Sequence, residues 1–348
     1  MKVSTEVFVT GATGFVGEHF LRLLCAEGVA VTALCRSSSK RGHLEDLDIT
    51  WVLGDVTDGP GLTAAVMSFG KAARARGSRA WFVHGAAVIS YATASGPLQD
   101  QANVEGTRNA VDAAKAAGVD RMLYVSSVVA VGLASGPTTS VDETEPFESV
   151  QQHTGQPYVG HYMRTKYLAE QLVHEAVDRG LNVVTVNPGA IFGEAQELSN
   201  TAEIFGRVDK SLIGRFAGPG SLSVVGVTDV ARGMLLALER GNTGERYLLC
   251  ERNLQLSELM EAISKQLGHN FRIRTLGPRT WALLVLATRI VDLVKPLRIV
   301  TPTALRLLSV QLRFESHKAR RDLGWEPAPF DQVLAETVAW LRRIGKVG

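Results

Sequence analysis

"VTGATGFVG" (residues 9–17) places glycines at positions 11, 14 and 17, directly after a short apolar run. Residues 6–11 are typical of a buried strand, and residues 15–28 of a helix that ends at a glycine. At such a strand-to-helix turn, glycine lets the backbone approach a pyrophosphate, which the free N–H groups of the helix N-terminus then bind. We interpret the stretch as a nucleotide-binding turn. A purely structural turn is the alternative, because a lone glycine pattern is weak.

The same alternation of strand and helix continues to residue 189. Long helical patterns cover residues 100–119 and 161–180, and further short apolar runs lie at 30–36, 49–56, 79–87, 121–131 and 182–189. This order predicts an α/β fold of the Rossmann type, a doubly wound parallel sheet covered by helices on both faces.

Beyond residue 189 the alternation becomes less regular. We therefore predict two parts, an NAD(P)-binding domain with the catalytic groups (1–189) and a smaller mixed portion (190–348). The second part mainly binds substrate, packs on the first and returns some segments to it. It is expected to contain helices over 255–268, with Ser257 as a candidate cap, and over 331–345.

An apolar segment near the C-terminus, "TWALLVLATRIVDLV" (280–294), is interrupted by Arg289 and Asp292. It is too short to span a bilayer, so no integral membrane segment is predicted. A buried or amphipathic helix is the simpler interpretation. The alternative is an interfacial helix that gives weak membrane association and helps to collect an apolar substrate.

Composition excludes several classes of protein. The chain has 348 residues, a formal net charge of +2 and no long basic run, so nucleic acid is not an expected partner. Its three cysteines are far apart, and no second histidine lies at ligand spacing from His84, so no metal site is expected. The N-terminus lacks the pattern of a signal peptide, which favours a reducing cytoplasm.

The segment "CRSSSKR" (35–41) indicates the type of dinucleotide. Where an NAD-binding turn places an acid for the ribose hydroxyls, this chain has Arg36, followed by Lys40. A guanidinium suits a 2′-phosphate, so NADP(H) is favoured and NAD(H) stays possible. Arg36 as a mere surface charge is the alternative.

After the third strand, Asp55 is expected to accept from the adenine amino group while Val56 packs on the ring. Asp55 as an ordinary turn residue is the alternative there.

Tyr162 and Lys166 are four residues apart and therefore share one face of a helix. A free phenol has a pKa near 10, and a neighbouring ammonium stabilises the phenolate and lowers that pKa. Ser126 and Ser127 end a strand and face opposite sides, so one hydroxyl can polarise a substrate carbonyl. The arrangement predicts carbonyl reduction with Tyr162 as the proton donor.

The chain resembles the extended short-chain dehydrogenase/reductase family. Its spacing is most similar to the dihydroflavonol-4-reductase-like branch, which includes cinnamoyl-CoA reductases, 3β-hydroxysteroid dehydrogenases and hopanoid-associated sugar epimerases. The resemblance is specific over residues 10–189 and loose in the last third. It rests on these motifs: "TGATGFVG" (10–17), "GDV" (54–56), "HGAA" (84–87), "NVEGT" (103–107), "YVSS" (124–127), "YMRTK" (162–166) and "NPG" (187–189).

The resemblance implies roles for individual residues. Ser127 is selected as the catalytic hydroxyl because it lies five residues before a glycine, and Lys166 also holds the nicotinamide ribose. Asn103 keeps a backbone kink and a water near the lysine, with a helix cap as the alternative. Family members commonly dimerise through helices like 100–119 and 161–180, so monomer and homodimer both stay open. The expected cofactor contacts further include Gly11, Thr13, Gly14, Phe15, Val16, Ala86, Ala87, Pro188 and Gly189.

The sequence leaves two functions open besides that of an NADPH-dependent reductase. A nucleotide-sugar epimerase would keep NAD bound and would use basic residues such as Arg207, Lys210 and Arg215 to hold a diphosphate. Arg36 argues against NAD. A catalytically silent NAD(P)-sensing protein is the third possibility, and the intact set of Ser127, Tyr162 and Lys166 argues against it.

The substrate is expected to be an apolar ketone or aldehyde, such as a specialised metabolite, polyketide or other aromatic, isoprenoid or steroid-like compound. Residues 190–227 are expected to form much of its pocket. They are rich in apolar side chains, with ordinary core as the alternative: Ile191, Phe192, Ile204, Phe205, Leu212, Ile213 and Phe216.

Overall fold

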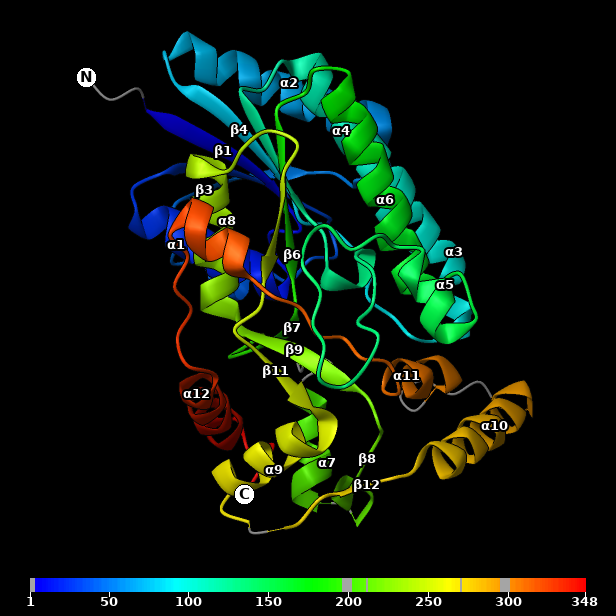
Figure 1. Ribbon diagram of the computed structural model, residues 1–348. Helices are drawn as coiled ribbons and strands as arrows, with labels where there is room; N and C mark the ends of the chain where they lie inside the picture. The colour runs from blue at the N-terminus through cyan, green and yellow to red at the C-terminus, as the bar shows by residue number, and fades with distance from the viewer. Residues whose placement is uncertain (1–3, 196–201, 211, 270, 295–300) are drawn as a thin grey trace.

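A seven-stranded sheet forms the centre of the molecule in the computed structural model, which describes residues 4–195, 202–210, 212–269, 271–294 and 301–348 (Figure 1). Its strand order is β10-β6-β5-β4-β1-β2-β3, and every pairing in it is parallel. The predicted doubly wound sheet is therefore confirmed. Its strands are β1 (Thr5–Thr10), β2 (Ala30–Cys35), β3 (Ile49–Leu53), β4 (Arg79–His84), β5 (Arg121–Val125), β6 (Val183–Pro188) and β10 (Arg246–Leu249).

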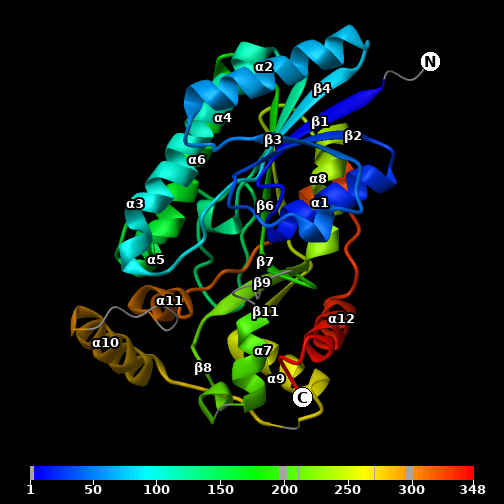
Figure 2. The ribbon, with the colours of Figure 1, turned by 180° about the vertical axis from the view of Figure 1, so that it is seen from behind.

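Helices cover both faces of this sheet, as Figures 1 and 2 show. On one face lie α1 (Phe15–Ala26) and α8 (Val227–Arg240), and on the other lie α2 (Gly59–Ala75), α4 (Gly106–Ala117) and α6 (His161–Asp178). Alternate residues of β1 point to opposite faces: Val7 and Val9 pack with α1 and α8, whereas Phe8 packs with α2. Burial on both faces explains why the strands are continuous apolar runs.

The second half of the chain builds smaller layers beside the carboxyl edge of the sheet. A three-stranded sheet has the order β11-β9-β7, and β12 pairs with β8. Phe192, Phe205 and Phe330 form the centre of the core between these elements. The elements are β7 (Ala190–Phe192), α7 (Ala202–Lys210), β8 (Phe216–Ala217), β9 (Ser221–Gly226), β11 (Arg252–Gln255), α9 (Leu256–Gln266), β12 (Arg274–Thr275) and α12 (Phe330–Arg343).

Three local predictions need correction. Ser257 does not cap α9, because the helix begins at Leu256 directly after β11 and Gln255 forms a capping box with Glu258. The helix predicted over 100–119 is divided into α3 (Gly96–Gln99), a π-helix (Asp100–Glu105) and α4. The helix predicted over 280–294 is present as α10 (Pro278–Val294), but most of its described side chains are exposed rather than buried.

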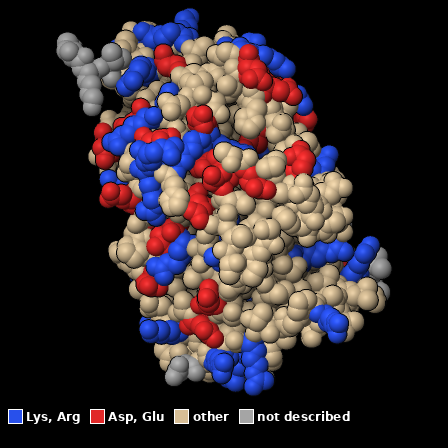
Figure 3. Space-filling model, viewed as in Figure 1, with Lys and Arg blue, Asp and Glu red and all other residues tan. Residues whose placement is uncertain are grey.

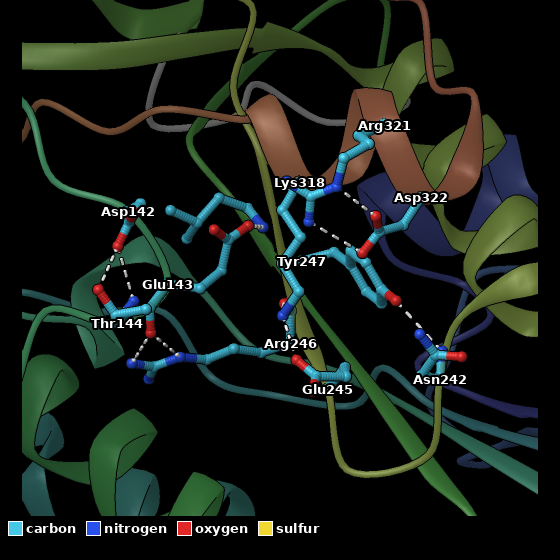
Figure 4. Close-up of polar contacts among 11 residues, drawn as sticks. Asp142, Glu143, Thr144, Asn242, Glu245, Arg246, Tyr247, Lys318, Arg321 and Asp322 are labelled. Atoms are coloured by element: carbon cyan, nitrogen blue, oxygen red, sulfur yellow. Dashed lines mark hydrogen bonds and ion pairs between the residues drawn. The ribbon is translucent and has the colours of Figure 1, made fainter.

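A polar cluster ties strand β10 to two other segments (Figure 4). The Arg246 side chain donates from Nε and Nη2 to the carbonyl oxygen of Glu143, at 2.9 and 2.5 Å. Lys318, which precedes a π-helix (Ala319–Leu323), donates to Glu245 and to the Arg246 carbonyl oxygen. These contacts hold a strand of the second half in the sheet of the first. The division into parts at residue 189 stays a prediction.

Replacing Arg246 by methionine should destabilise the protein by about 3 kcal/mol, because it leaves a buried carboxylate without its cation. Arg246 Nη1 lies 2.9 Å from Glu170 Oε1, and the Glu170 side chain is only 1% exposed. Arg179→Met is the matched control, since Arg179 pairs with Glu175 on an exposed helix face and should contribute at most about 1 kcal/mol. Urea unfolding of both variants checks the difference, and equal losses would contradict it.

Candidate active site

The glycine turn brings β1 and α1 close to the neighbouring strand. Gly11 has a φ of +75°, and a Cβ on it would lie 2.5 Å from the carbonyl carbon of Gly85, after β4. A Cβ on Gly17 would lie 2.1 Å from the Gly11 carbonyl oxygen. Both positions therefore require glycine, one for its backbone angle and both for space. Gly14 is the N-cap of α1 and has no side chain to occupy the N–H groups of the first turn.

A cavity of about 290 Å³ lies in front of this turn, at the carboxyl ends of β1, β2 and β3. Arg36 and Ser39 line it from the end of β2, and Asp55 and Val56 from the end of β3. The other predicted contacts that line this cavity are Gly11, Thr13, Gly14, Ala86 and Ala87. Its position matches the adenosine side of a dinucleotide site in a doubly wound sheet.

Lys40 and Asp55, two of the expected adenosine contacts, lie differently with respect to this cavity. Lys40 is exposed and is not among the residues that line the cavity, where Ser39 lies instead. Asp55 lines the cavity, but its Oδ1 accepts from the backbone N–H and the hydroxyl of Thr57, both at 2.9 Å. The carboxylate therefore holds the turn before α2, as the turn-residue alternative expects, and its contact with an adenine stays a prediction.

A second cavity, of about 320 Å³, shares Gly11, Gly14, Gly85 and Ala87 with the first. It is lined mostly by apolar groups and contains the predicted catalytic side chains. Ser127, Tyr162 and Lys166 all line it. Phe15, Val16, Pro188 and Gly189, which were predicted as cofactor contacts, do so too.

Tyr162 lies in the first turn of α6, and its side chain is almost fully buried. Burial raises the pKa of its phenol well above the usual value, and a hydrogen bond with the Ser127 side chain opposes that rise. The lowered pKa expected from the neighbouring lysine is therefore wrong for this structure, because the Lys166 ammonium donates to other groups. The ring of Tyr91 packs edge-on against it, with 6.2 Å between the ring centroids. At neutral pH the phenol therefore carries its proton, next to the Ser127 hydroxyl.

Lys166 lies one turn further along α6 and is also buried. Its Nζ donates to the Tyr124 hydroxyl at 2.9 Å and to the Val125 carbonyl oxygen at 2.8 Å. Burial lowers the pKa of Lys166 to about 7, although Glu170 opposes the shift. His84 stacks on Tyr124, and burial beside Lys166 lowers its pKa to about 3. His84 is thus a neutral residue beneath the lysine.

Asn103 lies inside the π-helix and not at a helix terminus, so it does not act as a helix cap. Its Oδ1 accepts from the Val88 N–H at 2.7 Å, and its Nδ2 donates to the Val88 carbonyl oxygen at 3.0 Å. Nδ2 also reaches the Thr165 hydroxyl, one residue before Lys166. Asn103 therefore joins the kinked helix, the segment after β4 and the start of α6, which agrees with the implied role at a kink.

The hydroxyls of the two adjacent serines have different partners. Ser126 donates to Glu170 at 2.6 Å, and Glu170 also accepts from Asn187 at 2.9 Å. The Ser127 hydroxyl accepts from the Val129 N–H at a long 3.4 Å and faces Tyr162. Ser126 is thus held by a buried carboxylate, whereas Ser127 can turn its hydroxyl toward a molecule in the cavity.

Comparison with known proteins shows which family the chain belongs to. Residues 7–250 match the family described as "NAD dependent epimerase/dehydratase family". The chain belongs to this family. Its members are NAD(P)-dependent enzymes that act on CH–OH and C=O groups, and the resemblance to extended short-chain dehydrogenases/reductases is confirmed.

Individual relatives of this epimerase/dehydratase-family chain cover more than nine-tenths of its length. A Synechocystis protein provisionally named dihydroflavonol 4-reductase is 32% identical over 98% of this chain and 95% of its own. A Stigmatella aurantiaca 4-hydroxy-2-methyl-3-oxo-4-farnesyl-3,4-dihydroquinoline-1-oxide ketoreductase is 31% identical over 92% and 91%. The crystal structure of gox2253 superposes with a TM-score of 0.82 at 30% identity, over 99% of this chain and all of its own.

The apolar wall of the second cavity contains only some of the residues that were predicted to form the substrate pocket. Of the apolar residues named from 190–227, Ile191 lines the cavity, and Leu222, which the prediction did not name, lines it as well. Phe192 and Phe205 are buried in a separate core. Phe216 is exposed, Ile204 packs against the separate core, and the side chains of Leu212 and Ile213 lie outside the described part of the chain.

The wall also contains residues that were not predicted from the sequence. Tyr91 comes from the segment after β4, and Leu307 and Leu312 come from near α11 (Pro302–Leu307). The Thr301 hydroxyl caps α11 and donates to the Tyr91 carbonyl oxygen at 2.8 Å, which fixes the two segments together. A motif search could not find these residues, because they contribute apolar surface from positions more than 200 residues apart.

Proposed function

We propose that the protein is an NADPH-dependent reductase that converts a ketone or aldehyde of an apolar small molecule into the alcohol. The observation that carries this proposal is the meeting of Ser127, Tyr162 and Lys166 in one largely apolar cavity. That cavity adjoins the glycine turn through shared lining residues. Relatives named as reductases of carbonyl compounds support the same reaction class.

The residues around the glycine turn fit a dinucleotide. Glycines at 11, 14 and 17 leave room at the N-terminus of α1 for a pyrophosphate, and Pro188 and Gly189 line the far cavity. Arg36 is exposed at the end of β2, lines the adenosine cavity and suits a 2′-phosphate. When bound, NADPH supplies the hydride for the carbonyl carbon.

Side chains of the protein then orient the carbonyl oxygen of the substrate and donate a proton to it. Tyr162 keeps its proton at neutral pH because burial raises its pKa, so it can donate that proton from Oη to the carbonyl oxygen. The Ser127 hydroxyl, beside it, donates a hydrogen bond that orients the same oxygen. The Lys166 ammonium stabilises the phenolate that remains after the transfer.

The wall of the cavity favours an apolar substrate over a sugar nucleotide. Ile191, Leu222, Leu307 and Leu312 line it, as does the partly buried Tyr91. Two of the three basic residues considered for a diphosphate, Arg207 and Arg215, have partners of their own. Arg207 pairs with Glu203, and the Arg215 guanidinium lies 4.4 Å from the centre of the Phe271 ring.

The pH dependence of kcat/KM for reduction should follow Lys166. Its pKa is lowered to about 7, so the fraction of ammonium falls as the pH rises through neutrality. Loss of that charge removes the stabilisation of the Tyr162 phenolate. Reductive kcat/KM should therefore fall about tenfold per pH unit above roughly pH 7. Lys166→Arg should move this limb to higher pH, and a flat profile between about pH 6 and pH 9 would contradict the assignment.

Fluorescence titration with NADPH and NADH, followed by a substrate screen, tests the proposal. We expect tighter binding of NADPH and its oxidation by members of a panel of apolar ketones and aldehydes. Turnover of nucleotide sugars with bound NAD would favour an epimerase instead. Tight binding of NADPH without oxidation by any carbonyl compound would favour a sensing protein.

A further inference from the structure

Helix α10 projects from the body of the molecule beside α11, at the lower right of Figure 1. One face packs against the protein. Trp281 is buried there, and its Nε1 donates to the Leu305 carbonyl oxygen of α11 at 2.9 Å. A Cβ on Gly218 would lie 2.9 Å from the Trp281 ring, so the backbone fits closely around this indole. The position of the helix is therefore defined by specific packing.

The opposite face of α10 is apolar and exposed. Leu283, Leu286 and Ile290, at helical spacings of three and four, are 67%, 54% and 58% exposed. Ala287 lies between them, and Leu284 and Val291 widen the strip. A surface helix of a globular protein normally turns such a strip inward. Here the apolar strip points outward, and an exposed apolar patch of this kind marks a site of interaction.

The surroundings of this outer face are cationic. Residues 271–294, all within the described part of the chain, contain four arginines and a single acidic residue, Asp292. Arg279 and Arg289 are exposed on α10 itself, and Arg272 and Arg274 are exposed just before it. In Figure 3, blue atoms without red ones flank the tan surface at the lower right, where α10 lies.

We propose that α10 is a membrane-binding helix that lies in the plane of an anionic bilayer. Its outer strip would enter the boundary between headgroups and acyl chains, while the arginines around it contact anionic lipid headgroups. No helix in the described part of the chain is long and apolar enough to cross a membrane, so an in-plane position is the one that fits.

A second copy of the chain is a poorer occupant for this face. A two-fold interface centred on the strip would bring the same cationic region of both copies together, and their repulsion would oppose association. An anionic lipid surface satisfies both the apolar strip and the charge around it. This inference does not depend on the reaction proposed above.

Co-sedimentation of the full chain with lipid vesicles tests the inference. Phosphatidylcholine vesicles with and without phosphatidylglycerol provide anionic and neutral surfaces. We expect binding to the anionic vesicles that weakens as salt is added. The double variant Leu286→Glu, Ile290→Glu should reduce binding at least about tenfold. Met67→Glu, at an exposed apolar position on α2, is the matched control and should bind like the unchanged chain.

Both glutamate variants place charge on an exposed surface, and circular dichroism checks that they fold. Charge reversal by Arg279→Glu and Arg289→Glu should lower binding to anionic vesicles. Absence of vesicle binding by the unchanged chain would overturn the inference, as would equal binding by the double variant. A dimer in analytical ultracentrifugation that Leu286→Glu, Ile290→Glu dissociates would also overturn it, because a second copy would then cover the strip.

Discussion

Tyr162→Phe should lower kcat for carbonyl reduction by about a thousandfold while the affinity for NADPH changes little. The substitution removes one oxygen atom and with it the acidic proton, and positioned proton donors contribute about 10²- to 10⁴-fold to rates. The phenyl ring keeps the apolar packing against Tyr91, so the cavity should keep its shape. Steady-state kinetics with the best ketone from the panel and fluorescence titration with NADPH measure the two quantities.

Tyr91→Phe is the matched control for that experiment. Tyr91 lines the same cavity and loses the same hydroxyl, and burial raises its pKa to about 12. In this proposal it shapes the wall and transfers no proton, so its kcat should stay within about tenfold of the unchanged protein. Equal rates for Tyr162→Phe and the unchanged protein would refute the role of Tyr162. A larger loss of kcat in Tyr91→Phe than in Tyr162→Phe would indicate that Tyr91, and not Tyr162, donates the proton.

Arg36→Gln should raise the Kd for NADPH about 10- to 100-fold and leave the Kd for NADH within about twofold. A hydrogen bond to a charged partner contributes about 1.5–3 kcal/mol, and only NADPH carries the 2′-phosphate. Glutamine keeps much of the side-chain length but loses the charge. Fluorescence titration with both cofactors gives the two constants from one preparation.

Arg41→Gln serves as the control for Arg36. Arg41 belongs to the same basic segment, but its guanidinium lies over the Trp51 ring, 5.6 Å from the centroid. Its loss should change the two dissociation constants by similar small factors. If NADH and NADPH weaken equally in Arg36→Gln, Arg36 binds the adenosine without reading the phosphate, and the preference for NADP(H) is wrong.

The sequence predicts the parts of this protein that local patterns determine. The glycine turn can be predicted because only glycine tolerates the φ of Gly11 and the close contact at Gly17. The strands of a doubly covered sheet are continuous apolar runs, and Tyr162 and Lys166 lie one turn apart on a single helix. Each of these features depends on residues close together in the chain.

Features that depend on distant packing could not be predicted. The sequence left a buried helix and an interfacial helix open for α10, because only the packing of other segments decides whether its apolar strip is covered. Phe192 and Leu307 show the same difficulty, since one apolar residue enters the core and the other lines the cavity. The selection of Ser39 within a run of three serines depends on the loop conformation after β2.

Transfer of deuterium from the nicotinamide C4 position of labelled NADPH is the most direct test of net carbonyl reduction. The protein is incubated with an apolar ketone from the panel and the labelled cofactor, and the product is analysed by mass spectrometry. We predict one deuterium in each alcohol formed and one NADPH consumed for each. Conversion of a substrate without net consumption of cofactor would contradict the proposal, because an epimerase returns the hydride within one catalytic cycle.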